Sequence, residues 1–263
     1  MEALLAKELA ALDIDTLGFL PLSECSVILP RLLFDGAQSA AQFLMPYYTV
    51  SYPERNVSLY AVSKDYHLFF RTLADRLTPI LSAAFPDDTF AFFCDHSPID
   101  EVSAAVKCGL GVKGKNGLLI HPRYGSYVFI GTMITTRKLT SPTTIKAPRT
   151  CLACGACERA CGFLAGKESV CASELNQRKA LTEEEVRSVR SKKIRWGCDV
   201  CQEVCPMNRN VPPTPIRFFY EDVIPVVTKE TLDGMSKTAL SERAYGWRGR
   251  KTITRNVSEE DVI

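Results

Sequence analysis

The sequence predicts an α+β fold in which a mixed helix-and-strand domain is followed by a small cysteine-rich domain. The spacing of apolar residues makes helix-like and strand-like stretches alternate over the first part of the chain. Eight of the eleven cysteines then lie between residues 151 and 205. We therefore expect an α/β domain over 1–145, a cysteine-rich domain over 146–212, and a tail over 213–263 that packs on the core.

The elements of the first domain follow from apolar periodicity and from the positions of proline and glycine. We expect helices at 2–12, 58–84 and 99–107, and strands at 17–22, 42–50, 89–94, 118–121 and 127–136. The helix at 58–84 carries one apolar face, which indicates core packing. Gly131 interrupts the last strand and indicates a bulge or a close approach of backbone.

Composition indicates a soluble enzyme with a core of its own. The chain has 263 residues, of which 46% are hydrophobic, and can bury a sizeable core. No apolar run reaches the roughly 18 residues that a membrane span needs, and the N-terminus lacks a leader pattern. We therefore expect a cytoplasmic protein. A net charge of +2 does not by itself indicate a nucleic-acid surface.

The cysteines form two runs with the spacing of iron–sulfur proteins. The first run is C-x2-C-x2-C-x3-C, at Cys151, Cys154, Cys157 and Cys161. Cys171 stands alone, and the second run is C-x2-C-x3-C at Cys198, Cys201 and Cys205, followed by Pro206. Each iron of a [4Fe–4S] cluster takes one terminal thiolate, so the cysteines suffice for two such clusters.

In the bacterial ferredoxin pattern the last cysteine of each run ligates the other cluster. One cluster is then held by Cys151, Cys154, Cys157 and Cys205, and the second by Cys161, Cys171, Cys198 and Cys201. Structural zinc is the alternative, because four-thiolate zinc also uses paired C-x2-C spacings. The x3 extension and the Cys-Pro ending favour iron–sulfur clusters, and a reducing cytosol disfavours a disulfide framework.

Residues 109–116, GLGVKGKN, look like a phosphate-binding loop in the wrong context. Such loops need a strand before them and a helix after them, so that the helix N-terminus meets the phosphate. Here the predicted helix precedes the loop and a strand follows it. We therefore expect a glycine-rich bend and not a nucleotide site.

Two later segments carry many charges. The helix expected at 181–195 is interpreted as a solvated face. The tail contains Trp247-Arg248-Gly249 and Arg255-Asn256, and its favoured interpretation is a segment docked on the domain surface. RNA contact is the alternative, because aromatic and arginine side chains stack on bases and hold phosphates.

Several separate blocks of the sequence carry a family resemblance. They are Tyr60-Ala61 with Asp65-Tyr66-His67, Asp95-x-Ser97, the GLGVKGKN bend, Tyr124-Gly125-Ser126, Met133 to Thr135, Gly197-Cys198-Asp199-x-Cys201-Gln202, Val204-Cys205-Pro206-x-Asn208, Trp247-Arg248-Gly249 and Arg255-Asn256. In these blocks the chain resembles the epoxyqueuosine reductases, which are iron–sulfur enzymes that also carry cobalamin.

The resemblance implies a cobalamin-binding α/β domain like those of reductive dehalogenases and nitroreductases, with a ferredoxin-like double [4Fe–4S] domain. It implies an oxidoreductase that reduces the epoxide of epoxyqueuosine in a tRNA anticodon to queuosine. An external low-potential donor such as ferredoxin or flavodoxin would supply electrons through the clusters to cobalt.

The resemblance also implies roles for residues. Asp95 matches the proton donor of the family, and burial at the end of strand 89–94 or the charges of Asp100 and Glu101 would raise its pKa. Without the family, Asp95 would be interpreted as a helix N-cap. His67 is interpreted as a helix residue. The segments that match the corrin environment give the expected cobalamin contacts Leu119, Ile130, Met133, Ser173, Cys198, Asp199, Val200 and Cys201.

The chain also departs from the family pattern. Gly162 replaces a proline, the N-terminal part is shorter, and we expect the C-terminal helical repeats that help to grip tRNA to be lacking. Two other hypotheses therefore stay open. One is a related cobalamin and [4Fe–4S] reductase of a small molecule, and the other is a dicluster electron carrier without cobalamin.

Overall fold

The structure, a computed structural model, describes residues 1–139 and 150–257. It contains two compact units. The sheet unit comprises Met1–Tyr47, Phe69–Ala153 and Met207–Ile216, and the cysteine unit comprises Tyr48–Leu68, Cys154–Pro206 and Arg217–Ile263. The units are interleaved along the chain, whereas the sequence predicted three consecutive parts. The predicted boundary after residue 145 and its linker lie outside the described residues.

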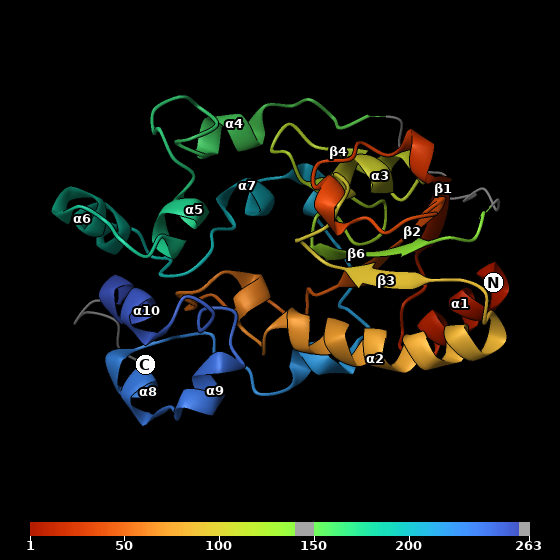
Figure 1. Cartoon of the computed structure of the whole chain (residues 1–263). Coiled ribbons are helices and arrows are strands. Elements are labelled where there is room, and N and C mark those ends of the chain that lie inside the picture. The colour runs from red at the N-terminus through yellow and green to blue at the C-terminus, as the bar shows by residue number, and fades with distance from the viewer. Residues whose placement is uncertain (140–149, 258–263) are drawn as a thin grey trace. The chain divides into compact units, whose positions relative to one another are not determined.

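A four-stranded antiparallel sheet forms the centre of the sheet unit, with the strand order β1-β2-β6-β3 (Figure 1). Its strands are β1 (Leu17–Pro21), β2 (Ser39–Pro46), β3 (Phe90–Phe93) and β6 (Val128–Thr135). The other elements that belong to it are α1 (Glu2–Ala10), most of α2 (Tyr66–Ala84), α3 (Glu101–Lys107), β4 (Val112–Lys113) and β5 (Leu119–Ile120).

Helices cover both faces of this sheet. On one face, Ala104 and Ala105 of α3 share a buried core with Leu44 of β2 and Ile134 of β6. On the other face, the ring of Phe70 from α2 stacks on Phe43 of β2, with ring centroids 6.3 Å apart. Every residue of β2 is buried, as expected for a strand that is covered on both sides.

Close backbone approach explains the glycine in β6. A Cβ at Gly131 would lie 2.2 Å from the ring of Phe43, which no side chain tolerates. The structure thus agrees with the close approach that the sequence indicated. The Phe43 ring is free to stack on Phe70 because Gly131 leaves room for it.

The cysteine unit is built from short helices around its own core. These are α4 (Ala156–Ala160), α5 (Ala172–Gln177), α6 (Glu183–Ser191), α7 (Val200–Glu203), α8 (Lys229–Gly234), α9 (Lys237–Ser241) and α10 (Arg250–Asn256). The fully buried side chains of Val57, Trp196, Tyr245 and Ile253 belong to one cluster. The expected tail is therefore part of this core, because it supplies Tyr245 and Ile253.

Two predicted helices begin or end elsewhere. The helix expected at 58–84 begins at Tyr66, and Leu59–Ala61 form a 3-10 turn before it. The helix expected at 181–195 spans Glu183–Ser191, where Thr182 and Glu185 form a capping box. Among the described residues, no helix is both long enough and apolar enough to cross a membrane.

Candidate functional site

The predicted proton donor lies on a constrained turn at the end of β3. Asp95 is exposed and has a φ of 63°, in the left-handed region that non-glycine residues rarely adopt. Its backbone N–H donates to Glu101 Oε2 at 3.0 Å. The N-cap of α3 is Asp100, whose Oδ1 accepts from the backbone N–H of Ser103 at 3.1 Å. The capping role considered for Asp95 thus belongs to Asp100.

Glu101, the first residue of α3, lies against the sheet. Its Oε1 accepts a hydrogen bond of 2.8 Å from the hydroxyl of Thr132 in β6. That hydroxyl in turn accepts from Nε2 of Gln42 in β2 at 3.0 Å. Burial raises the pKa of Glu101 to about 7, the Thr132 hydroxyl works against this rise, and the charge of Asp95 adds to it.

The two neighbouring carboxyls of α3 thus have opposite character. Burial opposes ionisation of Asp100, but the hydroxyl and N–H of Ser103 hold the pKa of Asp100 below its usual value. The sequence had suggested that Asp100 and Glu101 would raise the pKa of Asp95. In the structure, Glu101 is the acid whose proton is retained near neutral pH. The sequence alone did not single out this residue, because its pKa depends on burial and on Thr132.

Three of the expected cobalamin contacts lie in the sheet unit and differ in how far their side chains are exposed. The side chains of Leu119 and Met133 are buried, with relative exposures of 3% and 0%. Ile130 is partly exposed and packs against the same core cluster as Leu119. Of these three, Ile130 has side-chain surface that a ligand can contact.

The glycine-rich bend serves a β-hairpin. It follows α3 and contains β4, which pairs with β5, so helix and strands occur in the order that excluded a phosphate loop. A Cβ at Gly111 would lie 2.5 Å from the carbonyl oxygen of Ile120. A Cβ at Gly114 would lie 2.4 Å from Asn116 Oδ1. Gly111 is therefore explained by close packing against backbone, and Gly114 by close packing against side chains.

Two blocks of the family pattern meet within the sheet unit. Asn208 Oδ1 accepts from the backbone N–H of Ser126, and Asn208 Nδ2 donates to the Ser126 hydroxyl, both at 2.8 Å. Gly125 has a φ of 58°, and a Cβ there would lie 2.2 Å from Asn208 Oδ1. Asn208 and Tyr124-Gly125-Ser126 thus form one structural contact.

The cysteines of the two runs lie on α4, α7 and the turns beside them. No cysteine in the described part of the chain forms a disulfide, and Cys154 is exposed while the other run members are half-buried. Helices α4 and α7, which carry Cys157 and Cys201, pack against each other. Within residues 1–139 and 150–257, no group of three or more cysteine, histidine or acidic side chains is gathered closely enough to hold a metal ion.

Two members of the expected second cluster act electrostatically on a third. Burial raises the pKa of the Cys198 thiol, and the charges of Cys171 and Cys161 add to the rise. Cys161 and Cys171 thus each lie within electrostatic reach of Cys198. Their chemistry fits an iron–sulfur cluster, because thiolates that repel one another are stabilised by a cation.

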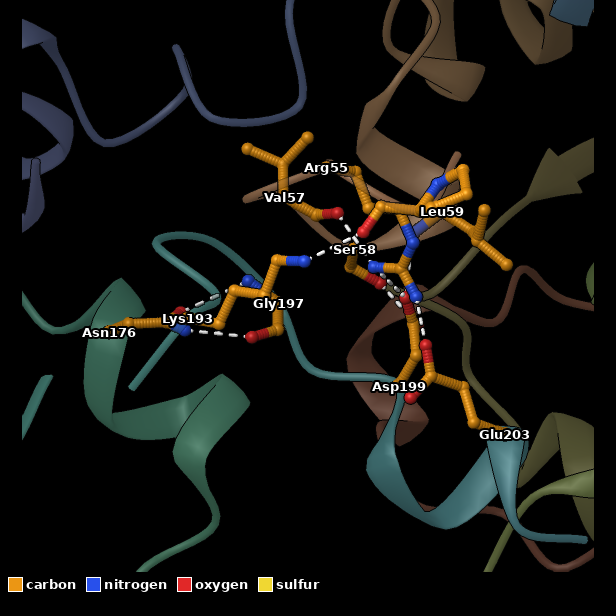
Figure 2. Close-up of polar contacts among 10 residues, drawn as sticks. Arg55, Val57, Ser58, Leu59, Asn176, Lys193, Gly197, Asp199 and Glu203 are labelled. Atoms are coloured by element: carbon orange, nitrogen blue, oxygen red, sulfur yellow. Dashed lines mark hydrogen bonds and ion pairs between the residues drawn. The ribbon is translucent and has the colours of Figure 1, made fainter. Parts of the chain in front are cut away.

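A network of hydrogen bonds holds the backbone just before Cys198 (Figure 2). Asn176 Nδ2 donates to the carbonyl oxygen of Gly197 at 2.7 Å, and the Gly197 N–H donates to Asn176 Oδ1 at 3.1 Å. Asn176 belongs to α5, whose N-cap is Cys171. The same side chain therefore links the helix of Cys171 to the segment of Cys198, although sequence spacing gave no sign of it.

Asp199 lies at the centre of a buried ion pair (Figure 2). Its carboxylate lies 2.9 Å from Arg55 Nη1, and it accepts hydrogen bonds from the Ser58 hydroxyl at 2.5 Å and the Leu59 N–H at 2.7 Å. The Arg55 guanidinium also pairs with Glu203. These partners engage the Asp199 carboxylate, so the cofactor contact expected of Asp199 stays a prediction, as do those of Ser173 and Val200.

The tail residues divide into two groups. Asn256 Nδ2 donates to the carbonyl oxygens of Asn176 at 2.7 Å and Arg195 at 2.9 Å, and Arg255 donates to that of Arg178 at 2.9 Å. These two residues therefore support the scaffold. Trp247 is 56% exposed, and the Arg248 guanidinium lies 3.6 Å from its ring centroid. Of the tail residues in the family blocks, Trp247 and Arg248 are the pair that we consider for ligand contact, because Trp247 is exposed.

His67 is engaged locally. Its Nδ1 lies 2.8 Å from Asp65 Oδ1, and its ring centroid lies 4.2 Å from that of Tyr66. The residue belongs to the first turn of α2, in agreement with its interpretation as a helix residue.

Known proteins resemble the chain in sequence. No protein-family model matches it. It is 35% identical over 207 residues to the epoxyqueuosine reductase of Listeria monocytogenes. The aligned region covers 73% of this chain and 53% of that protein. It is 27% identical over 248 residues to the epoxyqueuosine reductase of Cyclobacterium marinum. That alignment covers 84% of this chain and 76% of the relative. The chain spans about half the length of the first of these relatives.

Solved structures share the fold. An epoxyqueuosine reductase crystallised with an epoxyqueuosine-modified tRNA stem loop matches with a TM-score of 0.79 and 23% identity, over 97% of this chain and 79% of that chain. The epoxyqueuosine reductase of Streptococcus thermophilus matches with a TM-score of 0.79 and 20% identity, over the same shares. Sequence and fold agree: the chain is similar in sequence to epoxyqueuosine reductases over 73% of its length, and it shares the fold of their solved structures.

Proposed function

We propose that the chain is an oxidoreductase that removes the epoxide oxygen of epoxyqueuosine in tRNA to give queuosine. The observation that carries this proposal is the 35% identity to a curated relative that bears the name epoxyqueuosine reductase. The fold shared with a reductase crystallised on a modified tRNA stem loop supports tRNA as the partner. The acidic turn at the end of β3 supports a reaction that needs a proton donor.

The chemistry assigns a role to Asp95. Loss of the epoxide oxygen leaves a developing alkoxide or hydroxide, which needs an acid beside it. Asp95 is exposed at a strand end, where a substrate oxygen can approach it. Its left-handed φ and the hydrogen bond from its N–H to Glu101 constrain the backbone from which the carboxyl group extends. Asp95 donates the proton in this proposal.

Two [4Fe–4S] clusters and cobalamin complete the proposal. One [4Fe–4S] cluster is held by Cys151, Cys154, Cys157 and Cys205, and the other by Cys161, Cys171, Cys198 and Cys201. When bound, the clusters and cobalamin supply low-potential electrons, which an external ferredoxin or flavodoxin replaces. The electrostatic influence of Cys161 and Cys171 on the Cys198 thiol supports the second ligand set.

Cobalamin contacts are proposed for the residues that match the corrin environment of the family. Ile130, Ser173 and Val200 are partly exposed and fit a direct contact, as do the segments of Cys198 and Cys201. Leu119, Met133 and Asp199 are buried, so they fit a supporting role behind such contacts. The two hydrogen bonds between the Asn176 side chain and the Gly197 backbone hold the chain next to Cys198 in place.

Turnover of a defined tRNA tests the proposed function. The full chain is reconstituted anaerobically with iron, sulfide and cobalamin, and incubated with epoxyqueuosine-containing tRNA and a low-potential reductant. Nucleosides are then identified by mass spectrometry. We expect queuosine to form, and Asp95→Asn to lower kcat by at least two orders of magnitude while cluster and cobalamin spectra stay unchanged.

The neighbouring substitution Asp100→Asn provides the matched control, since asparagine also caps helices. It should retain turnover. If Asp95→Asn is as active as the wild type, Asp95 is not the donor. A fully loaded wild type that leaves epoxyqueuosine tRNA unchanged contradicts the proposed function itself.

A further inference from the structure

The proposed reaction needs more protons than Asp95 holds. Removing an epoxide oxygen as water breaks two C–O bonds, forms one C=C bond and two O–H bonds, and consumes two electrons and two protons. Low-potential iron–sulfur donors supply the electrons. Asp95 carries one exchangeable proton, so a second acid must restore it or protonate the oxygen again.

Glu101 is connected to Asp95 by direct contact. Its Oε2 accepts the Asp95 backbone N–H at 3.0 Å, within the turn that holds Asp95 at a φ of 63°. This hydrogen bond ties the Glu101 side chain to the backbone of the turn that carries Asp95. The position and the protonation of Glu101 therefore both bear on Asp95.

The sheet behind Glu101 gives this carboxyl a defined set of donors. Gln42 Nε2 donates to the Thr132 hydroxyl at 3.0 Å. The hydroxyl donates to Glu101 Oε1 at 2.8 Å, a shorter contact than its 3.3 Å to Gln42 Oε1. Ser97 also makes a side-chain hydrogen bond to Glu101. The strands β2 and β6 thus present neutral groups, and the charged group that acts on Glu101 is Asp95 from the turn.

We infer that Glu101 is a positioning residue and proton reserve for Asp95: it holds the Asp95 turn through the backbone N–H and returns the proton that Asp95 gives up. The inference rests on the proposed function. The ionisation of Glu101 is balanced near neutral pH, since burial raises its pKa to about 7. A reserve with this pKa takes up protons from water and releases them in the same pH range.

Kinetics against pH distinguish this role from a merely structural one. In the wild type, kcat should fall above about pH 7, where Glu101 loses its proton. Glu101→Gln keeps an acceptor for the Asp95 N–H but has no proton to give, so kcat should drop on the order of a hundredfold with an unchanged KM. The alkaline limb near pH 7 should disappear in this variant. Glu101→Asp should recover part of the lost rate.

Thr132 provides a second, independent variant. Thr132→Val removes the hydroxyl that favours the ionised carboxyl, so the alkaline limb should move to higher pH. Thr132→Ser keeps the hydroxyl and should leave the limb in place. Asp100→Asn controls for the removal of a neighbouring acid. An alkaline limb that persists in Glu101→Gln, or does not move in Thr132→Val, overturns the inference.

A readout without turnover separates this inference from the proposed function. In the full chain with selectively labelled aspartate, the Asp95 amide shift should titrate near pH 7 in the wild type and lose this inflection in Glu101→Gln. An amide shift that is flat from about pH 5 to about pH 9 overturns the inference. An inflection in a loaded protein that does not reduce epoxyqueuosine overturns the proposed function and leaves the contact between the two acids standing.

Discussion

Burial decides the charge of the titratable residues beside the sheet. It raises the pKa of Glu101 to about 7 and lowers the pKa of His121 to about 4. His121 Nδ1 accepts the backbone N–H groups of Arg123 and Tyr124, both at 3.2 Å. The imidazole is therefore neutral and carries its proton on Nε2. Its role is to hold the turn that leads into the Tyr124-Gly125-Ser126 block.

His121 should make stability depend on pH. Its pKa is lower in the folded chain than in the unfolded chain, so its contribution is present above about pH 6.5 and is lost as pH falls through about 4. His121→Asn keeps an acceptor for the two N–H groups without a titratable ring. We expect this variant to lose less stability than the wild type between pH 7 and about pH 4.

Urea unfolding at the two pH values measures this difference, because other acids titrate alike in both proteins. Equal losses in the wild type and in His121→Asn would show that His121 is not buried in the neutral form. The Arg123→Lys variant, which keeps the same backbone N–H, serves as the control.

Sequence reasoning reached Asp95 but not its partner. Asp95 stands in a block that resembles a known family, so the sequence points to it directly. Glu101 lies six positions later. Its carboxyl is distinguished by two contacts, one with the backbone N–H of the left-handed turn at Asp95 and one with the hydroxyl of Thr132. Neither contact follows from spacing along the chain.

At the scale of elements, tertiary hydrogen bonds override helix periodicity at the start of α2. The apolar stripe predicted a helix from residue 58, but the Ser58 hydroxyl and the Leu59 N–H both donate to Asp199. These bonds hold Leu59–Ala61 in a 3-10 turn, and α2 begins at Tyr66. Four expected strands lie within one residue of the observed ones at each end, because alternation with turn residues at both ends is a local signal. The strand expected at 42–50 is β2, which spans Ser39–Pro46.

The Arg55 cluster offers a matched pair of substitutions. Asp199→Asn leaves the buried Arg55 guanidinium without its buried counter-charge, so we expect a loss of about 3 kcal/mol in the free energy of unfolding. Glu203→Gln removes a partner whose side chain is 54% exposed, and should cost less than about 1 kcal/mol.

Urea unfolding followed by tryptophan fluorescence compares the two variants. Trp196 reports on unfolding, because it is fully buried in the core of the cysteine unit together with Val57. Equal costs for the buried and the exposed carboxylate would contradict the assignment of Asp199 as the principal partner of Arg55.

At the scale of the whole molecule, the two units draw on distant parts of the chain. The cysteine unit combines residues 48–68 with 154–206 and with the tail, which supplies Tyr245 and Ile253 to its core. A boundary search along the sequence cannot find such interleaving, because it depends on contacts between residues far apart. The cysteine spacing, by contrast, predicted the ligand candidates. The structure adds the hydrogen bonds from Asn176 to the Gly197 carbonyl and from Asn256 to the Asn176 carbonyl.

The central claim is that the chain carries two [4Fe–4S] clusters and cobalamin as a reductase of the epoxyqueuosine type. The most direct measurement is the metal content per chain after anaerobic reconstitution with iron, sulfide and cobalamin, together with visible and EPR spectra. The account predicts about eight irons, with cobalt bound as well. Zinc in place of iron, or the full iron content without cobalt, would contradict it.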